Sequence, residues 1–310
     1  MTASSPVLLP QNPHAVVMVR PLAFASNAET MADNHFQRDV ADGSAKSWAL
    51  AEFDAMVDTL RAAGVTVHVF DEAREEVPDA VFPNNWITTH HDGTLVTYPM
   101  YAPSRRKERR QDVLDYLGET YKVSRHIDLS PFAEASQFLE GTGAVVFDHT
   151  HRTAFMARSR RADEALLTTL CAELSYEPFI FDAVDHDGRP IYHTNVMMAV
   201  GEKTALVSPS CIQMDEDRAH LLAALARSDR AVITLSHHQI AAFAGNALEV
   251  NGEYGDVLIL SDRGFDSLSE AQRKTLMERV KVVPVDLPTI EISGGSARCM
   301  MAGIHLPKRG

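Results

Sequence analysis

Five residues with chemically competent side chains recur along the 310-residue chain at nearly constant spacing. Asn85, Glu140, His193, Asn246 and Cys299 are separated by 55, 53, 53 and 53 positions. They belong to the short segments FPNNW (82–86), LEGTG (139–143), HTN (193–195), GNALE (245–249) and GGSARC (294–299). Core packing does not readily produce such equal spacing. The pattern therefore favours a catalytic site to which five equivalent units each contribute one side chain.

Cys299 is the most reactive member of this set. A free cysteine is usually a small, buried and inert side chain. A thiol that meets an imidazole can instead act as a thiolate nucleophile. Cys171, within ALLTTLCAEL, and Cys211 have no comparable neighbours in the spacing pattern. We expect Cys171 at a buried helix position and Cys211 in a loop or strand.

A repeated order of elements would position the five residues. Apolar periodicity predicts a helix over 46–63, with Trp48, Leu50, Phe53, Met56, Val57 and Leu60 on one stripe. A strand follows at 65–70. Further helices are predicted near 105–117, 160–174, 215–227 and 268–279, each followed by a strand-like segment. Ser267 and Glu270 could form a capping box at the start of the last helix.

A hairpin signal precedes each of the last four helices, in HHDGTLVTY, DHTHRTAFMA, VGEKTALVS and NGEYGDVLIL. The chain therefore reads as five strand–hairpin–helix–strand units of about 55 residues, a length typical of radial arrays. Five such units can close into a ring, in which equivalent positions face a common axis. We expect a single catalytic domain over residues 1–310.

Composition limits the partners. The chain is 45% hydrophobic and 23% charged, as in globular proteins, and its formal net charge is −13. An acidic chain repels nucleic acid and anionic membrane surfaces, so we expect neither as a partner. The basic run RRKERR (105–110) is expected to be a solvated helix face.

Three cysteines without CxxC spacing argue for a reducing compartment and against a disulfide framework or structural zinc. The N-terminus has no signal-peptide pattern, and no apolar run is long enough to span a bilayer. We expect a cytoplasmic protein. Several histidines occur in pairs without carboxylates at ligand spacing, so we predict no metal site at these positions: His90, His91, His149, His151, His237 and His238.

At this point the sequence resembles the guanidino-group-modifying enzymes, the pentein superfamily. The resemblance rests on PDAVFPNNW, LEGTG, HTNVMMAVG and GGSARCMM in this order, and it spans nearly the whole chain. It implies an α/β fold, a five-bladed α/β-propeller of ββαβ units around a central active site. VRPLAF (19–24) is similar to the amidinotransferase-related branch that includes the citrulline hydrolases.

The resemblance also implies roles for individual residues. Cys299 matches the nucleophile, His193 the general acid and base, and Glu140 the carboxylate that holds a substrate nitrogen. Asp79 in PDAVF matches an acidic residue beside the substrate, although it could simply cap a turn after Pro78. The family needs neither a metal nor an organic cofactor for this chemistry.

Two positions depart from the deiminase pattern. Asn85 and Asn195 stand where arginine deiminases carry aspartates. A guanidinium has donors only and suits paired carboxylates, whereas a neutral ureido group also has a carbonyl acceptor. A carboxamide can donate to that carbonyl. The substitutions therefore favour citrulline, hydrolysed to ornithine, carbon dioxide and ammonia, or an enzyme that carries arginine through a ureido stage.

The substrate's α-carboxylate calls for an arginine. Arg105, Arg106 and Arg161 resemble family positions that bind it, with a solvated arginine at a helix start as the alternative for each. Asn27, Asn34 and Gln37 lie in an early polar loop that could cover the substrate. Asn246 has no family role beyond its position, so structure and substrate contact are both open.

Three classes of function remain. The first is a hydrolase of ureido or guanidino groups, which includes arginine dihydrolases, deiminases and dimethylarginine dimethylaminohydrolases. The second is an amidinotransferase, which passes the amidino group to an amine. The third is a binding protein on the same fold, disfavoured because such proteins lack the Cys/His/Glu set. We expect a small-molecule amino-acid substrate, and a homo-oligomer is compatible with the sequence.

Overall fold

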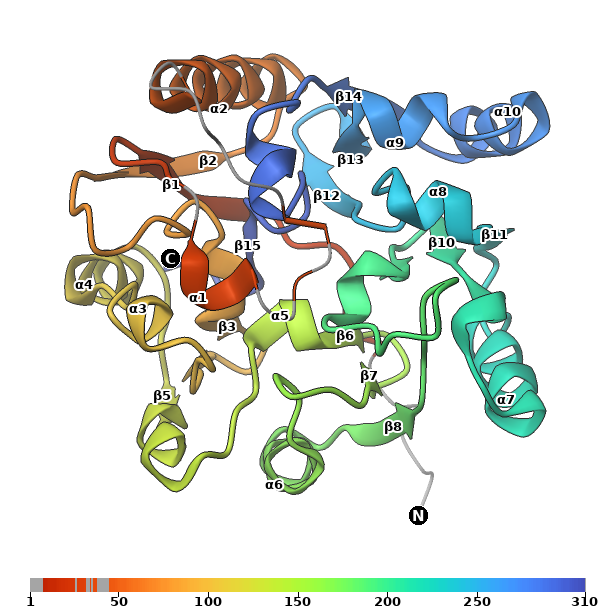
Figure 1. The fold of residues 1–310 in the computed structure, drawn as a ribbon, viewed down its shortest axis with the longest axis horizontal. Coiled ribbons are helices and arrows are strands. Elements are labelled where there is room, and N and C mark those ends of the chain that lie inside the picture. Colours follow the sequence, from red (N-terminus) through yellow and green to blue (C-terminus); the bar gives the residue numbers. More distant parts are fainter. Residues whose placement is uncertain (1–7, 26, 32–33, 35, 38–44, 310) are drawn as a thin grey trace.

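The computed structural model describes residues 8–25, 27–31, 34, 36–37 and 45–309. Among them are five three-stranded sheets arranged around a common centre (Figure 1). The sheets comprise β15 (Ala302–Ile304), β1 (Ala15–Pro21) and β2 (Val67–Glu72); β3 (Ile87–Thr89), β4 (Thr94–Thr97) and β5 (Arg125–Asp128); β6 (Val145–Asp148), β7 (Thr153–Ala157) and β8 (Glu177–Phe181); β9 (Met198–Val200), β10 (Thr204–Val207) and β11 (Ala231–Thr234); and β12 (Leu248–Gly252), β13 (Gly255–Ser261) and β14 (Lys281–Val285). The predicted α/β propeller of ββαβ units is confirmed.

Every sheet has the same pairing. Its first strand runs antiparallel to the middle strand, and its third strand runs parallel to the middle strand. A parallel connection requires a long crossover, usually a helix. Helices fill these crossovers and lie at the outside of the ring: α2 (Ala45–Ala62), α3 (Pro103–Arg106), α4 (Gln111–Thr120), α6 (Glu164–Leu174), α7 (Asp215–Leu225), α9 (Asp262–Asp266) and α10 (Glu270–Arg279).

The first sheet is built from both ends of the chain. β15 pairs with β1 in the register Ala15 to Ile304 and Val17 to Ala302. The hairpins predicted before the last four helices are present, as β3–β4, β6–β7, β9–β10 and β12–β13. The first helix has no hairpin of its own because the C-terminal strand supplies the missing partner. This pairing closes the ring.

Shorter elements lie between the strands and the longer helices. They comprise the helices α1 (Ala28–Met31), α5 (Gly141–Ala144) and α8 (His237–Ala241), and the 3₁₀ turns η1 (Pro83–Asn85), η2 (Ser130–Ala135), η3 (Thr194–Val196), η4 (Pro209–Cys211) and η5 (Ile290–Ser293). None of the described helices is both long and apolar enough to cross a membrane.

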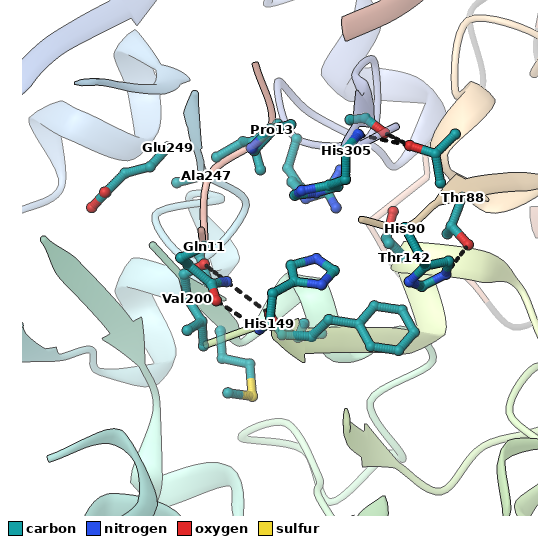
Figure 2. A pocket seen from close by; sticks show the side chains of 18 of the residues that line it. Gln11, Pro13, Thr88, His90, Thr142, His149, Val200, Ala247, Glu249 and His305 are labelled. Carbon is teal, nitrogen blue, oxygen red and sulfur yellow. Dashed lines mark hydrogen bonds between the residues drawn. The ribbon is translucent and has the colours of Figure 1, made fainter. Parts of the chain in front are cut away.

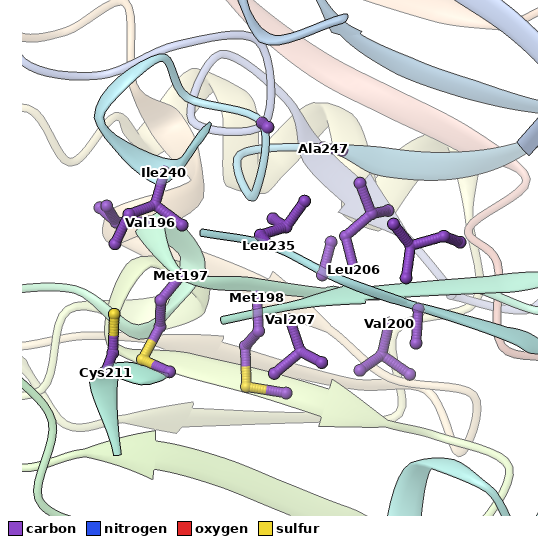
Figure 3. Close-up of a cluster of buried hydrophobic side chains, with 14 of the residues drawn as sticks. Val196, Met197, Met198, Val200, Leu206, Val207, Cys211, Leu235, Ile240 and Ala247 are labelled. Atoms are coloured by element: carbon purple, nitrogen blue, oxygen red, sulfur yellow. The ribbon is translucent and has the colours of Figure 1, made fainter. Parts of the chain in front are cut away.

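Apolar side chains pack between each sheet and its neighbouring elements. Figure 3 shows one such cluster, in which Cys211 lies with Met197 and Met198 near Ile240. Cys211 belongs to η4, and Cys171 is buried on α6. Both thiols therefore occupy the structural positions predicted for them.

Two predictions within the helices were wrong. Trp48 is 54% exposed, because it lies roughly 100° away from the buried stripe of α2 that contains Ala49 and Phe53. The capping box of α10 is formed by Ser269 and Gln272 instead of Ser267 and Glu270. Ser267 is instead the C-cap of the preceding short helix α9.

The basic run 105–110 is not one solvated helix face. Helix α3 ends at Arg106 and α4 begins at Gln111, so the run spans a break. Arg105 and Glu108 are buried, at 3% and 1% exposure. They form a bidentate ion pair, with Arg105 Nε 2.8 Å from Glu108 Oε1 and Nη2 2.9 Å from Oε2. The pairing explains why both charged side chains can leave water.

A buried ion pair also joins the third and fourth sheets. Arg230 Nη1 donates to Asp148 Oδ2 over 2.9 Å, and both side chains are 1% exposed. His151 adds a backbone N–H to Asp148 Oδ1 at 3.0 Å. Removal of one partner from such a pair leaves an uncompensated charge in the interior, which is strongly destabilising.

We therefore expect Asp148→Ala to lower the free energy of unfolding by about 3–5 kcal/mol, measured from the urea denaturation midpoint. Asp182→Ala is the matched control, because Asp182 pairs with Arg158 on the surface and such pairs contribute about 0–1 kcal/mol. The double variant Asp148→Ala/Arg230→Met should recover part of the loss. Equal, small losses at Asp148 and Asp182 would contradict this account.

Candidate active site

The five equally spaced residues lie at equivalent places in the five units. Each belongs to the segment that leads into the first strand of a sheet: Asn85 before β3, Glu140 before β6, His193 before β9, Asn246 before β12 and Cys299 before β15. All five are at most 3% exposed. Their constant spacing therefore reflects one position in a repeated unit, where each chain segment reaches the centre of the ring.

A small pocket of about 280 Å³ lies at this centre. The equally spaced residues Asn85, His193 and Cys299 all line it. The other lining residues are Thr30, Asn34, Asp79, Phe82, Arg105, Arg161, Tyr192, Ser293, Gly294 and Gly295. The pocket thus brings together a thiol, an imidazole, a carboxyl group, two guanidiniums and carboxamides.

Two carboxamides hold the Cys299 thiol. Asn195 Nδ2 and Asn246 Nδ2 lie 3.4 and 3.3 Å from Cys299 Sγ. Asn246 Nδ2 also contacts Asn195 O at 3.2 Å, and Asn246 Oδ1 accepts the Arg298 backbone N–H at 3.0 Å. N–H donors aimed at sulfur favour a thiolate, since they stabilise its negative charge.

His193 is hydrogen-bonded to Glu140, with 2.8 Å between His193 Nε2 and Glu140 Oε2. Burial lowers the pKa of His193, and the carboxylate of Glu140 opposes this effect only in part. The imidazole is therefore neutral at pH 7, when it can accept a proton. Its ring packs against that of Tyr192, with centroids 4.7 Å apart and the planes tilted by 37°.

Glu140 is held as a carboxylate. Its Oε1 accepts the Tyr101 backbone N–H at 2.9 Å, and Arg161 Nη1 lies 3.5 Å from its Oε2. Burial alone would raise the pKa of Glu140, but the Arg161 charge and the His193 hydrogen bond outweigh burial and keep this pKa well below its usual range. The His193–Glu140 pair is thus a neutral imidazole bonded to an anion.

Arg105 fixes the orientation of Asn85. Arg105 Nη1 donates to Asn85 Oδ1 over 2.9 Å. Because an arginine can only donate, the amide oxygen of Asn85 must face it and the NH2 group must face elsewhere. Within the described residues Asn85 Nδ2 is buried and has no hydrogen-bond partner.

Gly143 makes room for this arrangement. A Cβ at position 143 would lie 2.2 Å from Asn85 Nδ2 and 2.8 Å from His193 Nδ1. The Asn85 amide and the His193 imidazole therefore both pack directly against the backbone of Gly143. Gly294 is equally constrained, because its φ is +87° and a Cβ there would lie 2.2 Å from Asn34 Nδ2. LEGTG and GGSARC thus carry glycine where neighbouring side chains approach the backbone most closely.

Asp79 faces the pocket from the turn before η1. Asn27 Nδ2 and Thr30 Oγ1 donate to its Oδ2 over 2.8 and 3.3 Å. Its Oδ1 is buried without a hydrogen-bond partner among the described residues. Burial raises the pKa of Asp79, and Arg105 opposes this effect. Asp79 thus lines the pocket with one oxygen that accepts from Asn27 and Thr30 and one oxygen that has no partner among the described residues.

The three candidate arginines are placed differently. Arg105 and Arg161 line the pocket and are buried, and the Arg161 guanidinium lies 5.2 Å from the Tyr192 ring centroid. Arg106 is exposed, does not line the pocket, and donates to the backbone oxygens of Met100 and Tyr101.

The early polar loop reaches the site in part. Asn34 lines the pocket and lies 3.3 Å from Gly294 O. Gln37 contacts Thr30 at 2.8 Å, behind the lining residues. Asn27 does not line the pocket, but it donates a hydrogen bond to Asp79, which does. This loop therefore covers one side of the pocket.

Sequence reasoning gave no role to five residues of the site: Thr30, Phe82, Glu108, Tyr192 and Ser293. Phe82 is the first residue of the recognised segment FPNNW, and Tyr192 immediately precedes HTN, so position in or next to these segments was the available signal. Tyr192 Oη donates to Gly294 O over 2.6 Å. Glu108 carried no local signal, because an ion pair at i, i+3 is also common on solvated helices.

Comparisons with known proteins identify the family and the fold. The model of the eukaryotic N,N dimethylarginine dimethylhydrolase family matches residues 20–306. A search of curated proteins found no match.

Several solved structures have the same fold. The N-terminal domain of ArgZ, an arginine dihydrolase from the ornithine–ammonia cycle in cyanobacteria, is 18% identical with a TM-score of 0.75 and covers 94% of this chain and 98% of its own. Unliganded AgrE is 17% identical with a TM-score of 0.75, and the match covers 96% of this chain and 40% of AgrE. A DDAH from Pseudomonas aeruginosa complexed with citrulline is 12% identical with a TM-score of 0.67 and covers 94% and 99% of the two chains.

At identities this low, the structural similarity establishes the fold. The family model, in contrast, matches nearly all of the sequence. The chain belongs to the N,N dimethylarginine dimethylhydrolase family within the pentein superfamily of guanidino-modifying enzymes, and it is a hydrolase of non-peptide C–N bonds.

Proposed function

We propose that this hydrolase attacks the ureido carbon of citrulline through Cys299 and converts citrulline and water to ornithine, carbon dioxide and ammonia. The orientation of Asn85 carries the proposal. Its oxygen is bonded to Arg105, so its NH2 group is the end left for a ligand. An NH2 donor complements the carbonyl oxygen of a ureido group and repels the N–H groups of a guanidinium.

The site can perform the reaction in two stages. In the first stage the Cys299 thiol attacks the trigonal carbon while His193, neutral because it is buried, takes the thiol proton. As the C–N bond to the leaving nitrogen breaks, His193 returns the proton to that nitrogen. A thioester-like carbonyl then remains on Cys299.

In the second stage His193 removes a proton from water, which attacks this carbonyl and breaks the C–S bond. The resulting carbamate loses carbon dioxide in solution. Asn85 Nδ2 would donate to the oxygen on which negative charge develops, and donors of this kind typically contribute a factor of about 10²–10³ in rate. Glu140 would accept a substrate N–H and hold His193 in place through their 2.8 Å bond.

The remaining polar groups would bind the amino-acid part of the substrate. Arg105 already uses its Nε and Nη2 on Glu108, so we assign the α-carboxylate to Arg161, which also lines the pocket. Asp79, with its unpartnered Oδ1, is suited to the α-ammonium group. Asn34 and Thr30 would close the pocket over this end.

Arginine dihydrolysis is the second candidate, favoured by the carboxylates of Asp79 and Glu140 near the reaction centre. Two carboxylates can bind a guanidinium, and ArgZ is an arginine dihydrolase. Such an enzyme would run the same two stages twice, with citrulline as the intermediate. The test below has two further possible outcomes. One is hydrolysis of methylated arginines, which the family model suggests, and the other is transfer of the amidino group to an amine acceptor.

The first test is a product assay in which citrulline, arginine and dimethylarginine are offered separately. We expect ornithine and ammonia from citrulline, and no turnover by Cys299→Ala. Cys171→Ala is the matched control and should retain activity, because Cys171 is buried on α6. Accumulation of citrulline from arginine, without ornithine, would replace the proposal by a deiminase. Turnover that requires an added amine would replace it by an amidinotransferase.

The second test is Asn85→Asp. A carboxylate can only accept, so it removes the donor from the ureido oxygen. We expect kcat/KM for citrulline to fall by about 10²–10³-fold. Binding of arginine to the same variant, measured by calorimetry, should weaken less. Asn251→Asp, on the exposed part of β12, is the control and should keep wild-type kinetics. Unchanged citrulline turnover in Asn85→Asp would show that Asn85 does not contact the reacting group.

A further inference from the structure

A second cavity, shown in Figure 2, is lined by residues of the strands β3, β6, β9, β12 and β15 and shares no lining residue with the active-site pocket. About 620 Å³ of space lies between its lining atoms, and part of this space is open to solvent. The segments that contribute Asn85 and Cys299 to the active-site pocket contribute Ile87 and Arg298 to this cavity. We call it the axial cavity, and its polar lining residues are Gln11, Thr88, Thr89, His90, Thr142, His149, Glu249, Arg298 and His305.

Arg298 is an unusual component of the axial cavity. The described residues place no carboxylate within ion-pair distance of its guanidinium, and the hydrogen bond recorded for it runs from Nη1 to Met301 O at 2.8 Å. Burial lowers the pKa of Arg298 to about 10. Arg298 is half-buried, and a cation partly removed from water without a counter-charge gains from a ligand that supplies that charge.

The histidines of the axial cavity add donors without adding charge. Burial lowers the pKa of His90 to about 4, and it lowers the pKa values of His149 and His305 well below their usual range. His90 is 3% exposed, and its Nδ1 is buried without a partner among the described residues. Figure 2 shows His90, His149 and His305 around the open centre. Among the described residues these histidines do not bring three ligand atoms close enough for a metal ion.

Glu249 does not neutralise Arg298. Its carboxylate accepts from Thr204 N at 2.8 Å, Lys203 N at 3.0 Å and Asn12 Nδ2 at 3.3 Å, and also from the Thr204 hydroxyl. In Figure 2 this carboxylate points away from the three histidines. Burial also raises the pKa of Glu249, and its hydrogen bonds to Thr204, Lys203 and Asn12 oppose this effect.

We propose that the axial cavity binds a small oxyanion at Arg298 and that the bound anion lowers the reactivity of Cys299. Phosphate and bicarbonate share the necessary chemistry, which is a negative charge with several acceptor oxygens. Arg298, the neutral histidines and the threonine hydroxyls would supply donors. The regulatory part rests on the proposed role of Cys299 as nucleophile, whereas the binding part does not.

The two sites are joined by contacts and by charge. The Arg298 backbone N–H donates to Asn246 Oδ1, and Asn246 Nδ2 contacts Cys299 Sγ at 3.3 Å. The positive charge of Arg298 also favours a thiolate on the adjacent Cys299. An anion at Arg298 would neutralise that charge and weaken this support. Inhibition should then reduce kcat while the affinity for the substrate stays unchanged.

The test is calorimetric titration of the full chain with sodium phosphate and, separately, with sodium bicarbonate at constant ionic strength. We expect one anion per chain and unchanged binding when citrulline saturates the active-site pocket. Steady-state turnover at saturating anion should show kcat reduced about fivefold or more, with KM unchanged. Binding and inhibition by bicarbonate alone would identify the reaction's own product as the ligand. Binding and inhibition by both anions would identify a general oxyanion site.

Two variants locate the site. Arg298→Met should abolish anion binding, and Arg298→Lys, which keeps the charge but moves it, should weaken binding about tenfold. If Arg298→Met does not fold, the anion affinity of Arg298→Lys alone decides whether the site is at Arg298. Arg279→Met, at the exposed end of α10, is the control and should bind the anion normally.

Three results would overturn the proposal. The first is displacement of the anion by citrulline with a raised KM, which would place it at Arg105 or Arg161. The second is equal affinity in Arg298→Lys and the wild type. The third is the absence of any binding. Anion binding in a chain that does not hydrolyse citrulline would refute the proposed function while leaving the axial site intact.

Discussion

Every feature of the site depends on one geometric constraint: the first strand of each of the five sheets starts near the axis of the ring. The chain must cross the centre once per unit, and the residues before β3, β6, β9, β12 and β15 are buried there. The pairing of β15 with β1 completes the ring and places Cys299 beside Asn246 and Asn195. Without that closure the thiol would have neither of its amide donors.

Burial at the centre then sets the charges. Asp79, Glu108 and Glu140 face two guanidiniums, those of Arg105 and Arg161. Burial raises the pKa of Asp79, and it raises that of Glu108 to about 8, whereas Glu140 stays ionised next to Arg161 and His193. The surplus carboxyl group can hold a proton, so the set can approach neutrality before a substrate enters. Arg105 is bonded to both Glu108 and Asn85, and its bond to the Asn85 oxygen fixes the direction of the Asn85 amide.

The sequence predicted the parts that follow from repetition. Equal spacing identified the five central residues because each occupies the same position in a unit, and alternating turn and helix signals identified the hairpins and outer helices. Long-range pairing and side-chain burial could not be read in this way. The β1–β15 register joins the two ends of the chain, and Glu108 lies in a charged run whose local pattern is that of a solvated face. Trp48 was misplaced because a periodic stripe does not define which flank meets the sheet.

The central claim is that Cys299 forms a covalent bond to the ureido carbon. It is tested most directly by mixing the enzyme with citrulline carrying ¹³C at the ureido position, quenching in acid within one turnover, and sequencing the labelled peptides by mass spectrometry. The account predicts that the ¹³C label appears on Cys299 and is lost as turnover completes. When the attack of water is slowed, the labelled peptide should accumulate faster than it is lost. Turnover to ornithine with no label on Cys299 at any time would contradict it.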